Sequence, residues 1–98
     1  MENPLQLKSS YYDIACKDDL RAELKQTEPH SDVVLDLAMT DFIDCSCVGV
    51  LIVQLRSWRE QIPDTNLRLQ NVAPSVARML GLLELDRVFV IENVRSNP

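Results

Sequence analysis

The length, composition and charge of the chain exclude several classes of protein. Its 98 residues, 46% hydrophobic and 26% charged, suit one compact domain that needs neither disulfides nor a metal to hold its core. The formal net charge of −5 and the scattered basic residues argue against binding to nucleic acid or to an anionic membrane surface. No apolar run approaches the roughly 20 residues that span a bilayer, and the start of the chain lacks the features of an export signal. We therefore expect a single cytoplasmic domain covering residues 1–98.

The first third of the chain carries a strand pattern followed by a helix pattern. Residues 5–7 have apolar side chains on alternate positions, which predicts a short strand that continues toward Tyr12. Residues 18–25 predict a helix, because two leucines stand four positions apart among good helix formers. A cluster of helix breakers at residues 27–31 ends this helix, and we expect His30 within it to be a solvated loop residue.

The middle of the chain contains the clearest strand and the longest helix. Residues 33–37 are β-branched and nearly all apolar, which is typical of a central strand covered on both faces. Phe42 and Ile43 then lead into an amphipathic helix predicted from about residue 47 to residue 61, and Pro63 ends it. The apolar face of this helix carries Val48, Leu51, Ile52, Leu55 and Trp58. We expect Trp58 to pack in the core.

The last third of the chain carries two more strand patterns on either side of a helix. Residues 67–70 alternate and predict a strand, and residues 88–91 predict the final strand. Between them, Pro74 suits the first turn of a third helix and Gly81 suits its C-terminal stop. Alternation of strands and helices is typical of βαβ units. We therefore predict an α/β fold with a mostly parallel sheet of four to five strands and right-handed crossovers.

Ser46 is the leading candidate functional residue. Partners of α/β folds meet the loops beyond the carboxyl ends of the strands, and the loop at residues 41–46 is one of these. We expect Ser46 to be the N-cap of the following helix, where free N–H groups and the helix dipole accommodate negative charge. A phosphoryl group there would change the surface offered to a partner, and Asp44 would repel it. The plainer alternative, that Ser46 is only a cap and Asp44 only a turn or capping residue, stays open at this point.

The three cysteines, Cys16, Cys45 and Cys47, are expected to be free thiols. A structural zinc site would need about four ligands, and the single histidine lies far from the cysteine pair in the sequence. We therefore predict no metal site. Thiols near a helix N-terminus can have a lowered pKa, so a redox role for Cys45 and Cys47 remains an alternative.

The chain resembles the STAS domain, which bacterial anti-sigma factor antagonists and sulfate transporters share. In that family an apolar strand and a short connection precede Asp-Ser-Ser-Gly-Leu-Gly, which opens a helix. The matching residues here are Asp44, Cys45, Ser46, Cys47, Val48 and Gly49. Agreement at residues 12–21 and 67–82 extends the resemblance over nearly the whole chain. The resemblance implies a STAS-like fold.

The same resemblance implies roles for individual residues. Ser46 matches the serine that an anti-sigma factor of the serine kinase type phosphorylates. Asp44 matches the acidic residue just before that serine, and Asp13 matches an acidic residue that faces the kinase. Residues 44–49 would then bind the anti-sigma factor until phosphorylation breaks the complex, with a phosphatase as a second partner. ATP and magnesium belong to the kinase, so no cofactor is expected here. Cys45 in place of serine and Cys47 in place of glycine bear on the choice of partner.

Two other functions remain as alternatives. A constitutive STAS interaction subunit of a transporter or signalling assembly would bind its partner whatever the state of Ser46. An enzyme is disfavoured, because the sequence contains no glycine-rich phosphate loop, no nucleophile–histidine–acid set and no cluster of metal ligands.

Overall fold

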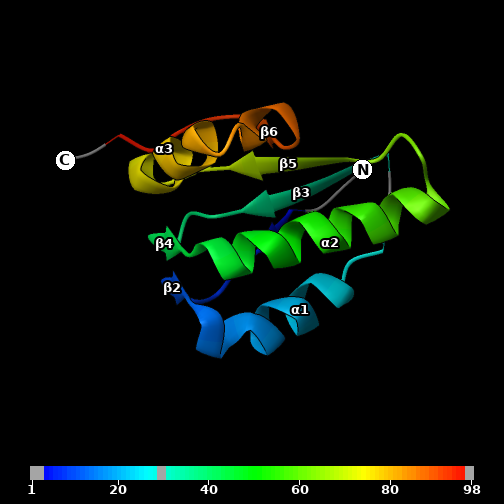
Figure 1. The fold of residues 1–98 in the computed structure, drawn as a ribbon, viewed down its shortest axis with the longest axis horizontal. Helices are drawn as coiled ribbons and strands as arrows, with labels where there is room; N and C mark the ends of the chain where they lie inside the picture. Colours follow the sequence, from blue (N-terminus) through cyan, green and yellow to red (C-terminus); the bar gives the residue numbers. More distant parts are fainter. Residues whose placement is uncertain (1–3, 29–30, 97–98) are drawn as a thin grey trace.

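A four-stranded sheet is the framework of the protein, for which the computed structural model describes residues 4–28 and 31–96 (Figure 1). The strands, in spatial order, are β1 (Leu5–Gln6), β3 (Asp32–Asp36), β5 (Asn66–Gln70) and β6 (Val90–Ile91). Every neighbouring pair is parallel. This confirms the predicted α/β fold with a mostly parallel sheet of four to five strands. His30 lies outside the described residues.

A second, two-stranded parallel sheet stands apart from the first. It pairs β2 (Tyr11–Tyr12) with β4 (Phe42–Ile43), so that Tyr11 lies opposite Phe42 and Tyr12 opposite Ile43. The prediction that the first strand continues toward Tyr12 is therefore wrong. The chain leaves the main sheet after β1, and the two tyrosines join a different strand, which places β2 and β4 beside the starts of two helices (Figure 1).

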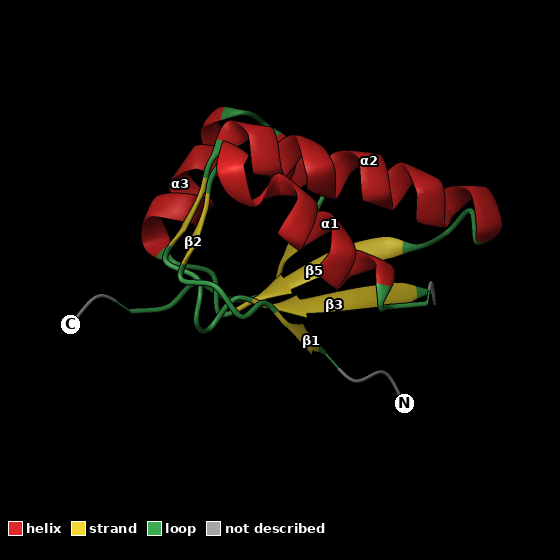
Figure 2. Ribbon diagram, turned by 90° about the horizontal axis from the view of Figure 1, so that it is seen from below, coloured by secondary structure: helices red, strands yellow, loops and turns green. Residues whose placement is uncertain are grey.

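Helices connect the strands and cover one side of the main sheet. The helical segments are η1 (Ile14–Cys16), α1 (Lys17–Lys25), α2 (Cys45–Gln61), α3 (Pro74–Leu82) and η2 (Leu85–Arg87). Figure 2 shows α1, α2 and α3 on the same side of the sheet. Leu20 and Leu24 of α1 are fully buried, as their spacing of four predicts, and Trp58 of α2 is buried in the same core. None of the described helices is both long enough and apolar enough to cross a membrane.

The prediction that residues 33–37 are covered on both faces is wrong. Val33 and Leu35 of β3 are buried, whereas Asp32, Val34 and Asp36 are only partly buried, so the strand is covered on one face. The strand order explains this. Each crossover connection adds its strand to the same edge of the growing sheet. Right-handed crossovers that all proceed toward one edge place their helices on the same face of the sheet.

The end of α3 also differs from the prediction. Gly81 lies within the helix, which continues to Leu82, and a methyl group at position 81 would meet no atom within 4 Å. The residue with a left-handed backbone conformation after α3 is Glu84, with a φ of 58°. Gly81 is therefore not the helix stop, because an ordinary residue three positions later adopts the required backbone conformation.

The chain beyond β6 continues in the same direction beside the segment that follows β5, where Val94 forms a parallel bridge with Val72. The Val72 N–H donates to the Asn93 carbonyl at 3.1 Å, and the Arg95 N–H donates to the Val72 carbonyl at 2.8 Å. These bonds bring Arg95 to the end of the sheet where β3 leads toward β4. That end carries the candidate site.

Candidate functional site

Asp44, and not Ser46, is the N-cap of α2. The helix begins at Cys45, and the Asp44 Oδ1 accepts hydrogen bonds from the Cys47 N–H at 2.9 Å and from the Ser46 hydroxyl at 2.6 Å. The prediction that Ser46 caps the helix is therefore wrong. A carboxylate two positions earlier accepts from the Cys47 N–H instead, and its full negative charge suits the positive end of the helix better than a hydroxyl does. Ser46 lies in the first turn as a hydrogen-bond donor.

The bond between Ser46 and Asp44 favours the charged form of the Asp44 carboxyl at this helix start. The pKa of the Asp44 carboxyl is lowered from its usual value, first by the hydrogen bond from the Ser46 side chain and then by the Cys47 backbone N–H. Asp44 is therefore a carboxylate at neutral pH. Any negative group added to the Ser46 oxygen would stand directly against it.

The segment around Asp13 lies beside this helix start. The Asp44 N–H donates to the Tyr12 carbonyl at 2.9 Å, as part of the β2–β4 pair, and the Cys47 thiol donates to the Asp13 carbonyl at 3.1 Å. The Asp13 carboxylate itself caps η1 by accepting from the Ala15 N–H at 3.0 Å. The structure thus brings together Asp13 and Asp44, two candidate residues that stand far apart in the sequence.

The remaining candidate residues differ in exposure. Cys45 is exposed, and Ser46 and Gly49 are partly exposed, whereas the side chains of Cys47 and Val48 are 0% and 2% exposed. Cys47 and Val48 therefore anchor the first turn of α2 in the core and are not available for side-chain contact with a partner. A methyl group at Gly49 would meet no atom within 4 Å, so the fold itself does not require glycine there.

The thiols of Cys45 and Cys47 lie in different environments, because Cys45 is exposed to solvent and Cys47 is buried. Burial, followed by the negative charge of Asp44, raises the pKa of the Cys47 thiol from 9.0 to about 11. This is the reverse of the lowered pKa on which the redox alternative depends for Cys47. Because the pKa is higher in the folded protein, the neutral thiol stabilises the fold below pH 9, and that contribution is lost as the pH rises through 11.

Thiol labelling at pH 8 is expected to separate these two cysteines. With a pKa of about 11, only about one Cys47 thiol in a thousand is ionised at this pH, and burial blocks the reagent as well. We expect iodoacetamide to modify Cys45 at least about a hundredfold faster than Cys47, as followed by peptide mass spectrometry. A Cys16→Ala background removes the third thiol, and denaturant should equalise the two rates. Equal rates in the folded protein would contradict this description of Cys47.

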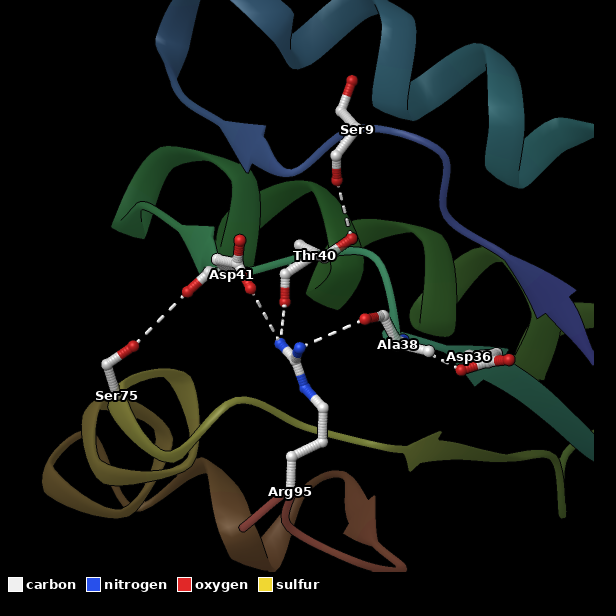
Figure 3. A network of polar contacts seen from close by, with 7 residues as sticks. All are labelled: Ser9, Asp36, Ala38, Thr40, Asp41, Ser75 and Arg95. Carbon is white, nitrogen blue, oxygen red and sulfur yellow. Dashed lines mark hydrogen bonds and ion pairs between the residues drawn. The ribbon is translucent and has the colours of Figure 1, made fainter. Parts of the chain in front are cut away.

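Arg95 fixes the connection between β3 and β4, as Figure 3 shows. Its guanidinium donates to the Ala38 carbonyl at 3.1 Å and to the Thr40 carbonyl at 2.6 Å, and it lies 3.3 Å from Asp41 Oδ1. The buried Thr40 hydroxyl donates in turn to the Ser9 carbonyl at 2.8 Å. One side chain from the end of the chain therefore holds the segment that leads into β4 and Asp44. Nothing in the sequence marks Arg95 as a functional residue or pairs it with residues more than fifty positions earlier.

Fold and site together define a class of protein. A parallel sheet with helices on one side presents a capped helix start next to a small two-stranded sheet. Within residues 4–28 and 31–96, no group of three or more possible metal ligands is present. The protein is thus an α/β domain whose most distinctive surface is the junction of β4 and α2.

Comparison with known proteins identifies the family. The STAS domain model matches residues 12–97, so the chain belongs to the STAS domain family. No curated protein matches the sequence.

Two solved structures share the fold. A candidate anti-sigma factor antagonist from Thermotoga maritima is 19% identical with a TM-score of 0.67, over 94% of this chain and 78% of that one. An anti-sigma-factor antagonist (STAS) domain protein from Planctomyces limnophilus is 18% identical with a TM-score of 0.58, over 84% of this chain and 66% of that one. At these identities the likeness establishes the fold alone.

Proposed function

We propose that this chain is a binding protein of the anti-sigma factor antagonist type, acting in the cytoplasm, and that phosphorylation of Ser46 releases its partner. The observation that carries the proposal is the 2.6 Å hydrogen bond from the Ser46 hydroxyl to Asp44 Oδ1 at the start of α2. Membership of the STAS family and the two similar structures, both described as antagonists of this type, support it. The partner is an anti-sigma factor of the serine kinase type, and a phosphatase restores the free hydroxyl.

Phosphorylation would change this site by a definite local mechanism. The phosphoryl group replaces the hydrogen that Ser46 donates and places about 1.5 to 2 negative charges against the Asp44 carboxylate. Asp44 is then driven away from the position in which it caps the Cys47 N–H. The helix stays in place, because Cys47 and Val48 remain buried in the core. The partner then meets a bulkier first turn of α2 and a displaced Asp44 carboxylate. The shape of the site no longer fits the partner, even if the partner's binding surface is basic.

The site is a poor candidate for catalysis. Asp44 is the group in contact with the Ser46 hydroxyl, and its lowered pKa makes it a weak general base near neutral pH. In this proposal the kinase therefore supplies the base, ATP and magnesium, and the chain supplies only the acceptor hydroxyl.

A phosphorylation assay with matched serine variants tests the proposal. The purified kinase partner with ATP and magnesium should add one phosphate to the chain and weaken the complex at least about tenfold, as measured by calorimetry. Ser46→Ala should abolish labelling. Ser75→Ala should not, although Ser75 is exposed and occupies the same second position in α3 that Ser46 occupies in α2. Ser46→Asp should weaken binding without phosphate, because it also repels Asp44.

Two outcomes would overturn parts of this proposal. Equal labelling of Ser46→Ala and the unaltered chain would place the phosphate elsewhere. Binding that does not change with phosphorylation would favour the alternative function, a constitutive interaction subunit of a transporter or signalling assembly.

A further inference from the structure

Two aromatic side chains stack on the outer face of the β2–β4 sheet. Tyr11 and Phe42 are register partners, and their ring centroids lie 4.8 Å apart at an interplanar angle of 27°. Their neighbours Tyr12 and Ile43 point the other way and are buried. The side chain of Tyr11 is 53% exposed and that of Phe42 is 36% exposed. The outer face of this small sheet is therefore aromatic and open to solvent.

The exposure of Tyr11 and Phe42 distinguishes them from the other aromatic residues of the chain. Only five residues are aromatic, and the other three, Tyr12, Trp58 and Phe89, are all buried. Aromatic side chains bring the largest gain on burial, and they are enriched where proteins bind one another. A pair left at the surface and already stacked is preorganised for contact with another molecule.

The stacked pair adjoins both halves of the candidate site. One residue after β2 comes Asp13, and one residue after β4 comes Asp44. Ile14, the first residue of η1, adds an apolar side chain that is 71% exposed. We call Tyr11, Phe42 and Ile14 the aromatic surface. Phe42 stands four residues before Ser46, on the strand that leads into α2, so a molecule that contacts Ser46 also approaches the end of the β2–β4 sheet.

Carboxylates edge the aromatic surface. Asp13 and Asp44 follow the two strands, and Asp41, which precedes Phe42, has a side chain that is 72% exposed and pairs with Arg95 at 3.3 Å. An apolar surface with an acidic edge complements an apolar pocket with a basic edge on a protein, and it repels an anionic membrane.

We infer that the aromatic surface is the anchor by which the partner protein docks, with Tyr11 and Phe42 filling an apolar pocket edged by basic side chains. This inference rests on the proposed function, because it assigns the surface to the same partner. It deepens that function by separating two tasks. The aromatic surface supplies affinity, and the contact of Ser46 with Asp44 controls whether the partner fits.

Serine substitutions on the aromatic surface test the inference. The probes are the serine-kinase anti-sigma factors of the source organism, purified individually, and the one that binds the unaltered chain is used for measurement. Tyr11→Ser and Phe42→Ser are each expected to weaken binding about 30-fold. Ile14→Ser, outside either strand, is expected to weaken it about tenfold. Leu82→Ser is the matched control and should leave the affinity unchanged. Leu82 is 79% exposed at the C-terminal end of α3, whereas the first turn of α3 is the part that contacts the β4 segment, through Ser75.

The outcomes distinguish failure of this inference from failure of the proposed function. Variants that keep the circular dichroism spectrum and unfolding midpoint of the unaltered chain, yet bind as tightly as it does, overturn the inference. If these variants bind tightly and phosphorylation of Ser46 still weakens binding, the proposed function is retained and only this inference fails. If the unaltered chain binds none of the probes, the proposed function fails and this inference with it. A dimer of the chain that Tyr11→Ser dissociates, seen by analytical ultracentrifugation, would assign the surface to self-association and also overturn the inference.

Discussion

Replacing Trp58 with alanine is expected to lower the free energy of unfolding by about 3–5 kcal/mol. Trp58 is the largest buried side chain and is 2% exposed, in the last part of α2 where this helix packs on the core. Truncation removes the buried indole and leaves a cavity that the surrounding side chains fill only in part. A loss of this size takes away much of the roughly 5–15 kcal/mol that holds a typical domain folded.

Urea unfolding followed by far-ultraviolet circular dichroism measures this loss. Tryptophan fluorescence cannot be used, because Trp58 is the only tryptophan and its variants lack it. Trp58→Phe should cost less than the alanine change, since it keeps an aromatic ring in the core. Val53→Ala is the control on the same helix, where the side chain is 64% exposed, and should change the free energy by less than about 0.5 kcal/mol. A Trp58→Ala loss below that control value would show that the indole is not packed as described.

Replacing Arg95 with methionine is expected to lower the free energy of unfolding by about 1.5–3 kcal/mol. The change keeps most of the apolar stem but leaves the carbonyls of Ala38 and Thr40 without their charged donor. We expect a value toward the lower end. The Arg95 Nε is buried and has no hydrogen-bond partner among the described residues, so its removal relieves one unfavourable desolvation.

Hydrogen exchange and two further variants locate the effect of Arg95. Amides of residues 40–42 should exchange faster in Arg95→Met, because the segment between β3 and β4 loses its support. Asp41→Asn should have little effect, since the Asp41 side chain is 72% exposed and its ion pair with Arg95 is worth little in water. Arg78→Met, at an exposed position on α3, controls for the loss of a surface charge. Unchanged exchange at residues 40–42 would contradict the supporting role of Arg95.

Periodicity was sufficient to predict the elements that bury a regular apolar face. Leu20 and Leu24 located α1, and the spacing from Val48 to Trp58 located α2, because a helix buries one stripe of side chains at intervals of three and four. The same reasoning could not predict that β3 is covered on one face only. Asp32, Val34 and Asp36 lie on the partly exposed face of β3, and the two aspartates fit an alternation of polar and apolar residues. Val34 is apolar, so this alternation is not evident in the sequence.

The start of α2 could not be settled from local pattern. Asp44 and Ser46 are both good N-cap residues, and the sequence contains no feature that ranks them. In the structure the β2–β4 pairing holds the Asp44 backbone extended, through the bond from its N–H to the Tyr12 carbonyl. That pairing joins strands of two residues each from distant parts of the chain, and so short a strand leaves almost no periodic signal.

The order of the strands in the main sheet has a consequence for how the protein folds during synthesis. Among the described strands of that sheet, β1, β3, β5 and β6 lie side by side in the order in which the ribosome produces them. Each newly made strand therefore finds its pairing edge already in place and never has to insert between two strands that have paired. The nascent chain can extend its sheet stepwise from the N-terminal side, and Arg95, which follows β6, forms its contacts with the β3–β4 connection after these strands are made.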